Sequence, residues 1–184
     1  MSAENQHNNG HGVVGKETDE SYTPFYAVDP LLKYIPKTMK IWCHFDKEWS
    51  AYVKRFKEEG YDVTYSHLES GQDFFEYEPE DYDIIISNPP FSITDKILER
   101  LYSLGKPFIM LLPLKYLQSK VRGKMFSENG IELLTFDLRI GFYMNNLEKI
   151  KEGNNQAVVY FCWKVLPEKL IVEKLEKYDR SLKE

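Results

Sequence analysis

The chain has 184 residues, of which 42% are hydrophobic and 29% charged, so most of it is expected to fold as one domain with a real core. Its 24 basic and 29 acidic side chains give a net charge of −5. This charge argues against a general nucleic-acid coat protein, because such a protein needs a broadly basic surface. It leaves open an enzyme with one local basic face.

Several features of the sequence indicate a cellular compartment. We find no signal peptide and no apolar run long enough to span a membrane. Cys43 and Cys162 lie in apolar, strand-like stretches, without a Cys/His spacing typical of a metal site. We therefore expect a cytoplasmic protein with buried free thiols, no metal and no membrane contact. Residues 1–21 are rich in Asn, His, Gly and Glu, and are predicted to form a disordered tail.

After the tail, strand-like and helix-like patterns alternate. In chain order we predict a helix over 29–35, a strand over 40–45, a helix over 49–59, strands over 62–66 and 84–87, a helix over 93–104, a strand over 108–112, a helix over 114–126, strands over 131–136 and 157–165, and a charged amphipathic helix over 168–184. The alternation predicts an α/β fold with a mostly parallel central sheet and helices on both faces. Residues 22–167 would form this domain, with residues 168–184 as a separate C-terminal helix.

The most informative stretch is residues 83–91, which read Asp-Ile-Ile-Ile-Ser-Asn-Pro-Pro-Phe. A buried strand ends here in Asn88, Pro89, Pro90 and Phe91, and a helix follows at once. Asn88 offers an amide oxygen as acceptor, the two prolines stiffen the turn, and Phe91 offers a flat ring. Ligands in open α/β sheets bind beyond the carboxyl ends of the strands. The motif therefore predicts a rigid site for a planar group that bears an amine.

Two other predicted strands end near the same edge in polar and aromatic residues. An acidic group after the second strand suits ribose hydroxyls. Asp73, followed by Phe74, suits an exocyclic amine and a purine ring. The residues at these two strand ends are Phe45, Asp46, Glu48, His67, Glu69, Asp73 and Phe74.

With these motifs the chain resembles class I S-adenosylmethionine-dependent methyltransferases of the N6-adenine DNA type, as found in phages and restriction–modification systems. Residues 88–91 are similar to that family's Asn/Asp-Pro-Pro-Tyr/Phe motif, in the same setting after a hydrophobic strand. Residues 71–75 resemble the segment that contacts the cofactor adenine. Tyr22, Thr23 and Pro24 resemble the segment that closes over the methionine moiety. The similarity spans most of the chain after the tail.

The resemblance implies a Rossmann-like class I methyltransferase fold and methyl transfer from S-adenosylmethionine to adenine N6 in DNA. The target nitrogen would donate to the Asn88 side chain and the Pro89 carbonyl, and Phe91 would stack on an extruded base. Two acceptors on its hydrogens localise the lone pair of a conjugated amine, so positioning supplies most of the acceleration. The implied cofactor-binding residues are Tyr22, Thr23, Pro24, Phe45, Asp46, Glu48, His67, Glu69, Asp73 and Phe74.

The chain departs from the family pattern in three places. The usual turn after the first strand is Asp-Pro-Phe/Cys-x-Gly-x-Gly, whereas residues 43–50 lack both glycines, which allow close backbone approach to the cofactor. His67 stands where the family has a ribose-binding acid, with Glu69 two residues later as a substitute. No target-recognition domain is evident. The one basic cluster that follows a strand end, a candidate for DNA phosphates or a solvated helix face, comprises Lys115, Lys120, Arg122 and Lys124.

Three functional hypotheses follow from these residues. The first is methyl transfer to adenine N6 in DNA, which requires Asn88. The second is a catalytically degenerate binding protein on the same fold, which interferes with a host defence complex as its protein partner or captures the cofactor. The third keeps methyl transfer and changes the substrate to RNA, protein glutamine or a small amine, because the same motif geometry serves any planar amide or arylamine nitrogen.

Overall fold

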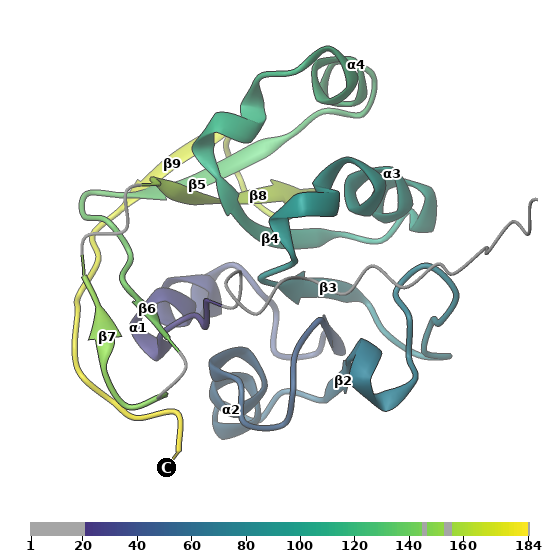
Figure 1. Ribbon diagram of the computed structural model, residues 1–184. Helices are drawn as coiled ribbons and strands as arrows, with labels where there is room; N and C mark the ends of the chain where they lie inside the picture. The colour runs from purple at the N-terminus through teal and green to yellow at the C-terminus, as the bar shows by residue number, and fades with distance from the viewer. Residues whose placement is uncertain (1–20, 145–146, 153–155, 184) are drawn as a thin grey trace, which may run out of the picture.

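The computed structural model describes residues 21–144, 147–152 and 156–183 (Figure 1). It confirms the predicted α/β fold of the Rossmann-like kind: a mostly parallel seven-stranded sheet with helices on both faces. The strand order across the sheet is β2-β1-β3-β4-β8-β5-β9. The predicted disordered tail lies outside the described residues, apart from Ser21.

The elements fall close to their predicted positions for most of the chain. The strands of the main sheet are β1 (Ile41–His44), β2 (Val63–Ser66), β3 (Ile84–Ser87), β4 (Phe108–Pro113), β5 (Glu132–Phe136), β8 (Val158–Trp163) and β9 (Leu170–Glu173). The helices are α1 (Phe25–Val28), α2 (Ala51–Glu58), α3 (Thr94–Leu104) and α4 (Lys120–Asn129), with 3-10 turns η1 (Asp29–Lys33), η2 (Leu68–Ser70), η3 (Phe91–Ile93) and η4 (Leu114–Leu117). A small hairpin, β6 (Phe142–Tyr143) and β7 (Ile150–Lys151), was not predicted.

The central strands are buried on both faces, which explains their unbroken apolar runs. In β1, Ile41 and Cys43 pack in one core cluster with Phe56 of α2, whereas Trp42 packs in the other cluster with Leu98 of α3. Strands β3 and β4 alternate in the same way between the two clusters. Because successive side chains of a strand point to opposite faces, each strand contributes to both cores.

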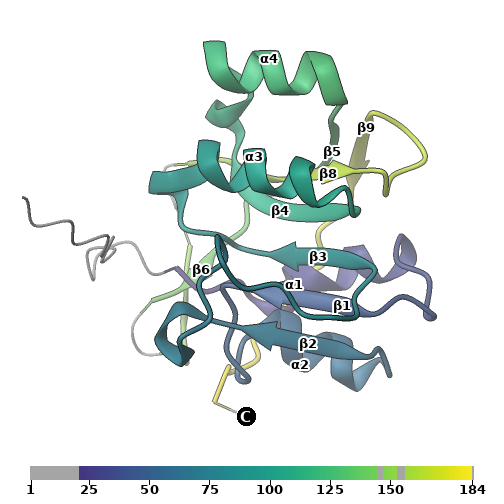
Figure 2. The ribbon, with the colours of Figure 1, turned by 90° about the vertical axis from the view of Figure 1, so that its right-hand side faces the viewer.

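The sheet reverses its direction of winding between β1 and β3. From β1 the chain passes through α2 to β2 on one side, then returns through residues 67–83 to β3 on the other side of β1. Strands β1, β2, β3 and β4 run parallel, so their carboxyl ends lie at one edge, on the left in Figure 2. This switch point is where open α/β sheets bind ligands.

The predicted C-terminal helix over 168–184 is wrong. Residues Leu170–Glu173 instead form β9, which pairs with β5 in parallel, and an extended segment follows. The exposed edge of β5 supplies backbone partners, and Ile171 and Val172 are β-branched, which favours a strand over a helix. The predicted helix over 114–126 is also divided, into η4 and α4, with Ser119 as the N-cap of α4.

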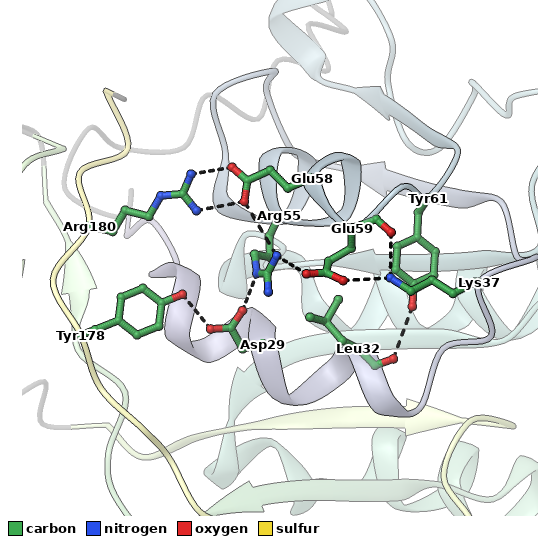
Figure 3. Close-up of polar contacts among 9 residues, drawn as sticks. All are labelled: Asp29, Leu32, Lys37, Arg55, Glu58, Glu59, Tyr61, Tyr178 and Arg180. Atoms are coloured by element: carbon green, nitrogen blue, oxygen red, sulfur yellow. Dashed lines mark hydrogen bonds and ion pairs between the residues drawn. The ribbon is translucent and has the colours of Figure 1, made fainter.

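The C-terminal segment after β9 fastens the chain end to α1 and α2. Tyr178 donates to Asp29 at 2.7 Å, and Arg180 pairs with Glu58 (Figure 3). These side chains are partly exposed to solvent, and such ion pairs contribute little to stability. The buried side chains of Leu175 and Leu182 therefore supply most of the hold.

Gly141 and Gly123 are expected to respond oppositely to alanine. A Cβ at Gly141 would lie 2.5 Å from Ile150 Cγ2 and 3.1 Å from the Lys151 carbonyl oxygen, whereas a Cβ at Gly123, inside α4, meets nothing within 4 Å. We expect Gly141→Ala to lower the free energy of unfolding by about 1–3 kcal/mol, because it overpacks the hairpin. Gly123→Ala should raise it by roughly 0.5–1 kcal/mol. Urea denaturation measures both, and equal effects of the two changes would contradict this packing.

Candidate functional site

The candidate site lies where the carboxyl ends of β1, β2 and β3 meet. The Asn-Pro-Pro-Phe turn follows β3 directly, as predicted, and leads into η3 and α3. Pro89 is buried, Pro90 is exposed and has a φ of −63° as it precedes η3, and Phe91 is half-buried. The Phe91 carbonyl accepts hydrogen bonds from the Thr94 and Tyr116 hydroxyls, which fixes the turn from behind.

Asn88 has one satisfied and one unsatisfied end. Its Nδ2 donates to the carbonyl oxygen of Ser21 at 2.9 Å, and this contact fixes the orientation of the amide. Its Oδ1 is buried and has no hydrogen-bond partner among the described residues. Buried polar atoms in folded proteins are nearly always paired, and an unpaired acceptor costs about 1–3 kcal/mol. An acceptor kept in this state at the switch point is suited to an N–H donor of a ligand.

A second unusual group lies on the neighbouring strand end. Asp46 is only 7% exposed, and its Oδ2 accepts a hydrogen bond from the Ser87 hydroxyl at 2.6 Å. Burial raises the pKa of the Asp46 carboxyl to about 7, although hydrogen bonds from Ser87 and Ser50 lower it in part. No cation pairs with Asp46 among the described side chains. The two serine hydroxyls therefore stabilise the ionised form only in part, and a cation beside Asp46 would stabilise it further.

The backbone directly before Asp46 is strained. Phe45 has a φ of +69°, in the left-handed region that a bulky residue rarely adopts. The turn contains no glycine between Cys43 and Ser50, so Phe45 itself adopts the left-handed conformation. Its ring packs against His44, at 4.3 Å between ring centroids, and against Phe74 at 5.1 Å. Such outliers persist where the surrounding structure enforces them, often at binding sites.

His44 is a structural residue. It is buried, and its Nδ1 lies 2.6 Å from the Ser66 hydroxyl, which also accepts from Trp42 Nε1 at 2.8 Å. Burial, and next the charges of His67 and Arg100, lower the pKa of His44 to about 3. The imidazole is therefore neutral at physiological pH and lies beneath the site.

The low pKa of His44 makes the stability of the fold depend on pH. An unfolded imidazole takes up a proton near pH 6.5, whereas folded His44 does not until about pH 3. The unfolded chain then binds more protons, so we expect His44 to reduce stability as the pH falls from 6.5 towards 3. An NMR titration of the imidazole nitrogens checks this, with His44→Gln to assign the signal. A His44 midpoint above pH 5 would contradict the burial.

An open cleft of about 240 Å³ adjoins Asp46 at the ends of β1 and β2. The residues that line it are Asp46, Lys47, Glu48, Tyr65, His67, Glu69 and Ser70. Four of the predicted cofactor residues thus lie together. Glu69 pairs with Lys47 at 2.8 Å, and this contact lowers the pKa of the Glu69 carboxyl. His67 Nδ1 accepts from the Glu69 backbone N–H at 3.2 Å, which orders η2 along the cleft.

Tyr22, Thr23 and Pro24 also lie beside the site. Tyr22 forms a backbone bridge with Tyr143 through hydrogen bonds of 2.9 and 3.0 Å, and its ring meets Trp49 edge-on at 4.8 Å. Thr23 Oγ1 is buried without a hydrogen bond of normal geometry, although the Tyr52 hydroxyl lies near it. Because Ser21 holds Asn88, this segment forms one wall next to the motif.

Asp73 and Phe74 are placed differently from the prediction. Phe74 is 2% exposed and packs between Trp42 and Arg100, so its ring is a core residue and has no free face for a purine. Asp73 Oδ1 accepts from the Phe75 backbone N–H at 2.9 Å, a local turn contact. The neighbouring Phe75 is the partly exposed ring of this loop. Phe74 and Phe75 are adjacent, and the loop conformation decides which of the two rings is buried and which is exposed.

The predicted substrate-binding cluster is divided. Arg122 donates to the Tyr116 and Gln118 carbonyls and pairs with Asp95, so it joins α4 to α3 and is not available for phosphates. Its side chain is only 12% exposed. Lys115 and Lys120 are exposed at η4 and the start of α4. These two lysines keep their predicted role as a proposal.

The chain was compared with protein-family models, curated proteins and solved structures. No protein-family model and no curated protein matches the chain. Among solved structures, a candidate class I S-adenosylmethionine-dependent methyltransferase from Listeria monocytogenes is similar at 13% sequence identity. The match covers 88% of this chain and 68% of that one, with a TM-score of 0.44.

Ser87 and Ser50, which donate hydrogen bonds to Asp46, were not among the predicted site residues. Ser87 was visible as the one polar residue in an isoleucine strand, directly before Asn88. Ser50 is the N-cap of α2, which hides its second role.

Among the described residues, no group of three His, Cys, Asp or Glu side chains is arranged to hold a metal. No helix within residues 21–144, 147–152 and 156–183 is long and apolar enough to cross a membrane.

Proposed function

We propose that the protein transfers a methyl group from S-adenosylmethionine to an exocyclic amine, with adenine N6 in DNA as the substrate. The observation that carries the proposal is the buried Asn88 Oδ1 at the switch point of the sheet, to which no group of residues 21–144, 147–152 or 156–183 donates a hydrogen bond. This atom can accept a hydrogen bond from the amino hydrogen of a planar base, and its rigid turn would hold the acceptor in place.

The cleft fits the proposed cofactor by the chemistry of its residues. S-adenosylmethionine, when bound, supplies an activated methyl group on a positively charged sulfur, together with a cationic amine. Asp46 offers a buried carboxyl without a cation, and Glu48 a second one at the same strand end. Glu69 and the neighbouring polar residues of β2 line the part of the cleft that suits ribose hydroxyls.

Asn88 and Pro89 would act on the amine in this proposal. An arylamine nitrogen is a weak nucleophile because its lone pair is delocalised into the ring. Acceptors on both of its hydrogens, Asn88 Oδ1 and the Pro89 carbonyl, draw the lone pair out of conjugation towards the methyl carbon. The nitrogen forms the new bond, the carbon–sulfur bond breaks with its electrons remaining on sulfur, and a proton then leaves the nitrogen to solvent. Phe91 is half-buried and presents a ring against which an extruded base stacks.

DNA would contact the protein locally. The overall charge of −5 disfavours broad backbone contact, so the exposed Lys115 and Lys120 near the carboxyl edge would neutralise only a few phosphates. The resulting salt dependence would be shallow. The proposal places the protein in the cytoplasm, where both cofactor and DNA are available in bacterial or phage-infected cells.

One observation favours a second function, a binding protein that has lost catalysis. Lys47 and Trp49 occupy the turn where the similar family has glycines, and Lys47 already pairs with Glu69 across the cleft. A protein of this kind would bind the cofactor or a protein partner without turnover. Its biological activity would not depend on Asn88.

Calorimetry with S-adenosylmethionine, followed by methyl transfer to DNA read by mass spectrometry of the nucleosides, tests the proposal. We expect saturable binding and N6-methyladenine in the product. Binding without transfer to any nucleic acid favours the second function, and transfer to RNA, protein glutamine or a small amine moves the substrate. Failure to bind at millimolar cofactor contradicts methyl transfer altogether.

A further inference from the structure

Strand β9 ends the sheet with an apolar edge. Leu170 and Val172 are 57% and 63% exposed, an uncommon state for two aliphatic residues on one short strand. No other strand among the described residues pairs with its outer side. Edge strands that display unpaired backbone groups and apolar side chains are templates for another strand.

The backbone of β9 presents its free groups at these same residues. The Lys169 and Glu173 carbonyls accept from the Leu133 and Asp137 N–H groups, so they face β5. Backbone groups alternate along a strand, and in a parallel ladder every second residue turns both its N–H and its C=O to one side. Leu170 and Val172 therefore direct theirs to the open edge.

The charges around this edge are self-complementary. Residues 168–174 read Glu-Lys-Leu-Ile-Val-Glu-Lys, and all but two of them are exposed. When this segment lies antiparallel to itself about its middle residue, Glu168 faces Lys174, and this opposite-charge pair occurs twice. Lys169 faces Glu173, whose carboxylate already bonds to Lys33 and Tyr34 of its own copy, so the two Glu168–Lys174 pairs supply the charge complementarity and no like-charge pair forms. A parallel arrangement in register would place every charge against its own copy.

We propose that a second copy of the chain pairs with β9 in antiparallel orientation, so that the two sheets join across a twofold axis at Ile171. Leu170 of each copy then faces Val172 of the other, and the backbone groups directed to the edge form four hydrogen bonds. Registers shifted by two residues oppose Leu170 with Leu170 or Val172 with Val172, and place charged side chains against apolar ones. Only the register centred on Ile171 satisfies both the charges and the apolar pairs.

This arrangement makes a prediction about the clefts. β9 runs parallel to β5, and β5 runs in the same direction as β4. The carboxyl end of β9 therefore lies at the same edge of the sheet as the cleft. Antiparallel pairing therefore places the two clefts at opposite edges of the joined sheet. Each cleft is complete within one copy, so pairing is independent of the proposed methyl transfer.

Sedimentation equilibrium of the full chain, from micromolar to millimolar concentration, tests the proposal. We expect the average mass to rise from 21.8 kDa towards twice that value. Val172→Pro removes an N–H that faces the open edge while the contacts with β5 remain, so it should weaken association at least about tenfold. Circular dichroism and cofactor calorimetry show whether this variant folds.

Exchanging the charges of Glu168 and Lys174 tests the pairing directly, because a merely structural role of β9 would not make the association constant depend on the signs of these charges. Glu168→Lys and Lys174→Glu each place like charges opposite one another in both pairs, and each should weaken association. The double variant restores opposite charges and should restore the wild-type constant. Lys96→Glu, which reverses the charge of an exposed residue of α3, is the matched control and should leave the association constant unchanged. A wild-type chain that keeps the mass of one copy at millimolar concentration overturns the proposal, as does a dimer that Val172→Pro and both single charge changes leave unaltered.

Discussion

Asn88→Ala is expected to lower the rate of methyl transfer by about two to three orders of magnitude while cofactor binding persists. The change removes the buried Oδ1, which has no partner within the described protein and is therefore free for the amine. Acceptors that act on charge developing during the reaction contribute mainly to turnover and little to ground-state binding. Single-turnover kinetics with saturating cofactor, together with calorimetry, separate the two quantities.

Asn88→Asp refines this test. Aspartate keeps an acceptor towards the substrate but loses the Nδ2 donor that now contacts the Ser21 carbonyl. Two oxygens would then face each other, so we expect a partial loss of about tenfold that reports the value of the fixed orientation. Asn129→Ala, an exposed residue of α4, is the control and should leave turnover unchanged. If Asn88→Ala retained wild-type turnover, the motif would have no part in the reaction.

Asp46→Asn is expected to stabilise the free protein at pH 8 while it weakens cofactor binding. The carboxyl has a pKa near 3.8 in the unfolded chain and about 7 in the folded one, mainly because of burial. Well below pH 3.8 the carboxyl is protonated in both states and has no effect on stability. Between these values the folded state holds a proton that the unfolded chain has lost, so stability falls as the pH rises through this window. Above pH 7 the cost is constant, on the order of 4 kcal/mol.

The difference in unfolding free energy between Asp46→Asn and the wild type isolates this titration from that of His44. It should lie near zero at pH 4 and grow to a few kcal/mol at pH 8, measured by urea denaturation. Affinity for the cationic cofactor should rise with pH up to about 7 in the wild type, since the ionised carboxylate is the binding form. The variant should show weak, pH-independent affinity. A variant that binds as tightly as the wild type would remove Asp46 from the cofactor site.

Together these two predictions describe a site that is less stable than its surroundings. The Asn88 acceptor, unpaired within the described residues, and the buried Asp46 carboxyl, which two serines stabilise only in part, both cost folding free energy, and Phe45 adds backbone strain. Such costs are offset by the large two-sided core and are relieved when a ligand supplies the missing partners. The degenerate alternative differs in one measurable respect, because it would need the cofactor contacts without Asn88.

Local sequence patterns predicted the elements whose formation depends mainly on their own residues. The isoleucine run of β3 is buried on both faces wherever it is placed in a parallel sheet, so the sequence identifies it directly. The Asn-Pro-Pro-Phe turn is stiffened by its own prolines and therefore follows β3 as expected. The C-terminal segment was mispredicted because its spacing fits a helix, whereas pairing with β5 depends on a neighbour that is distant in the sequence.

Residue type and local spacing were enough to predict the two-sided sheet and the strand ends. Which polar groups lack partners within the described residues depends on contacts between distant segments. Asp46 meets Ser87, 41 residues away, and Asn88 meets Ser21, 67 residues away. Only the tertiary structure showed that Phe74 belongs to the core and Arg122 to a helix contact. Burial and hydrogen-bond pairing arise between distant segments, and no local pattern records them.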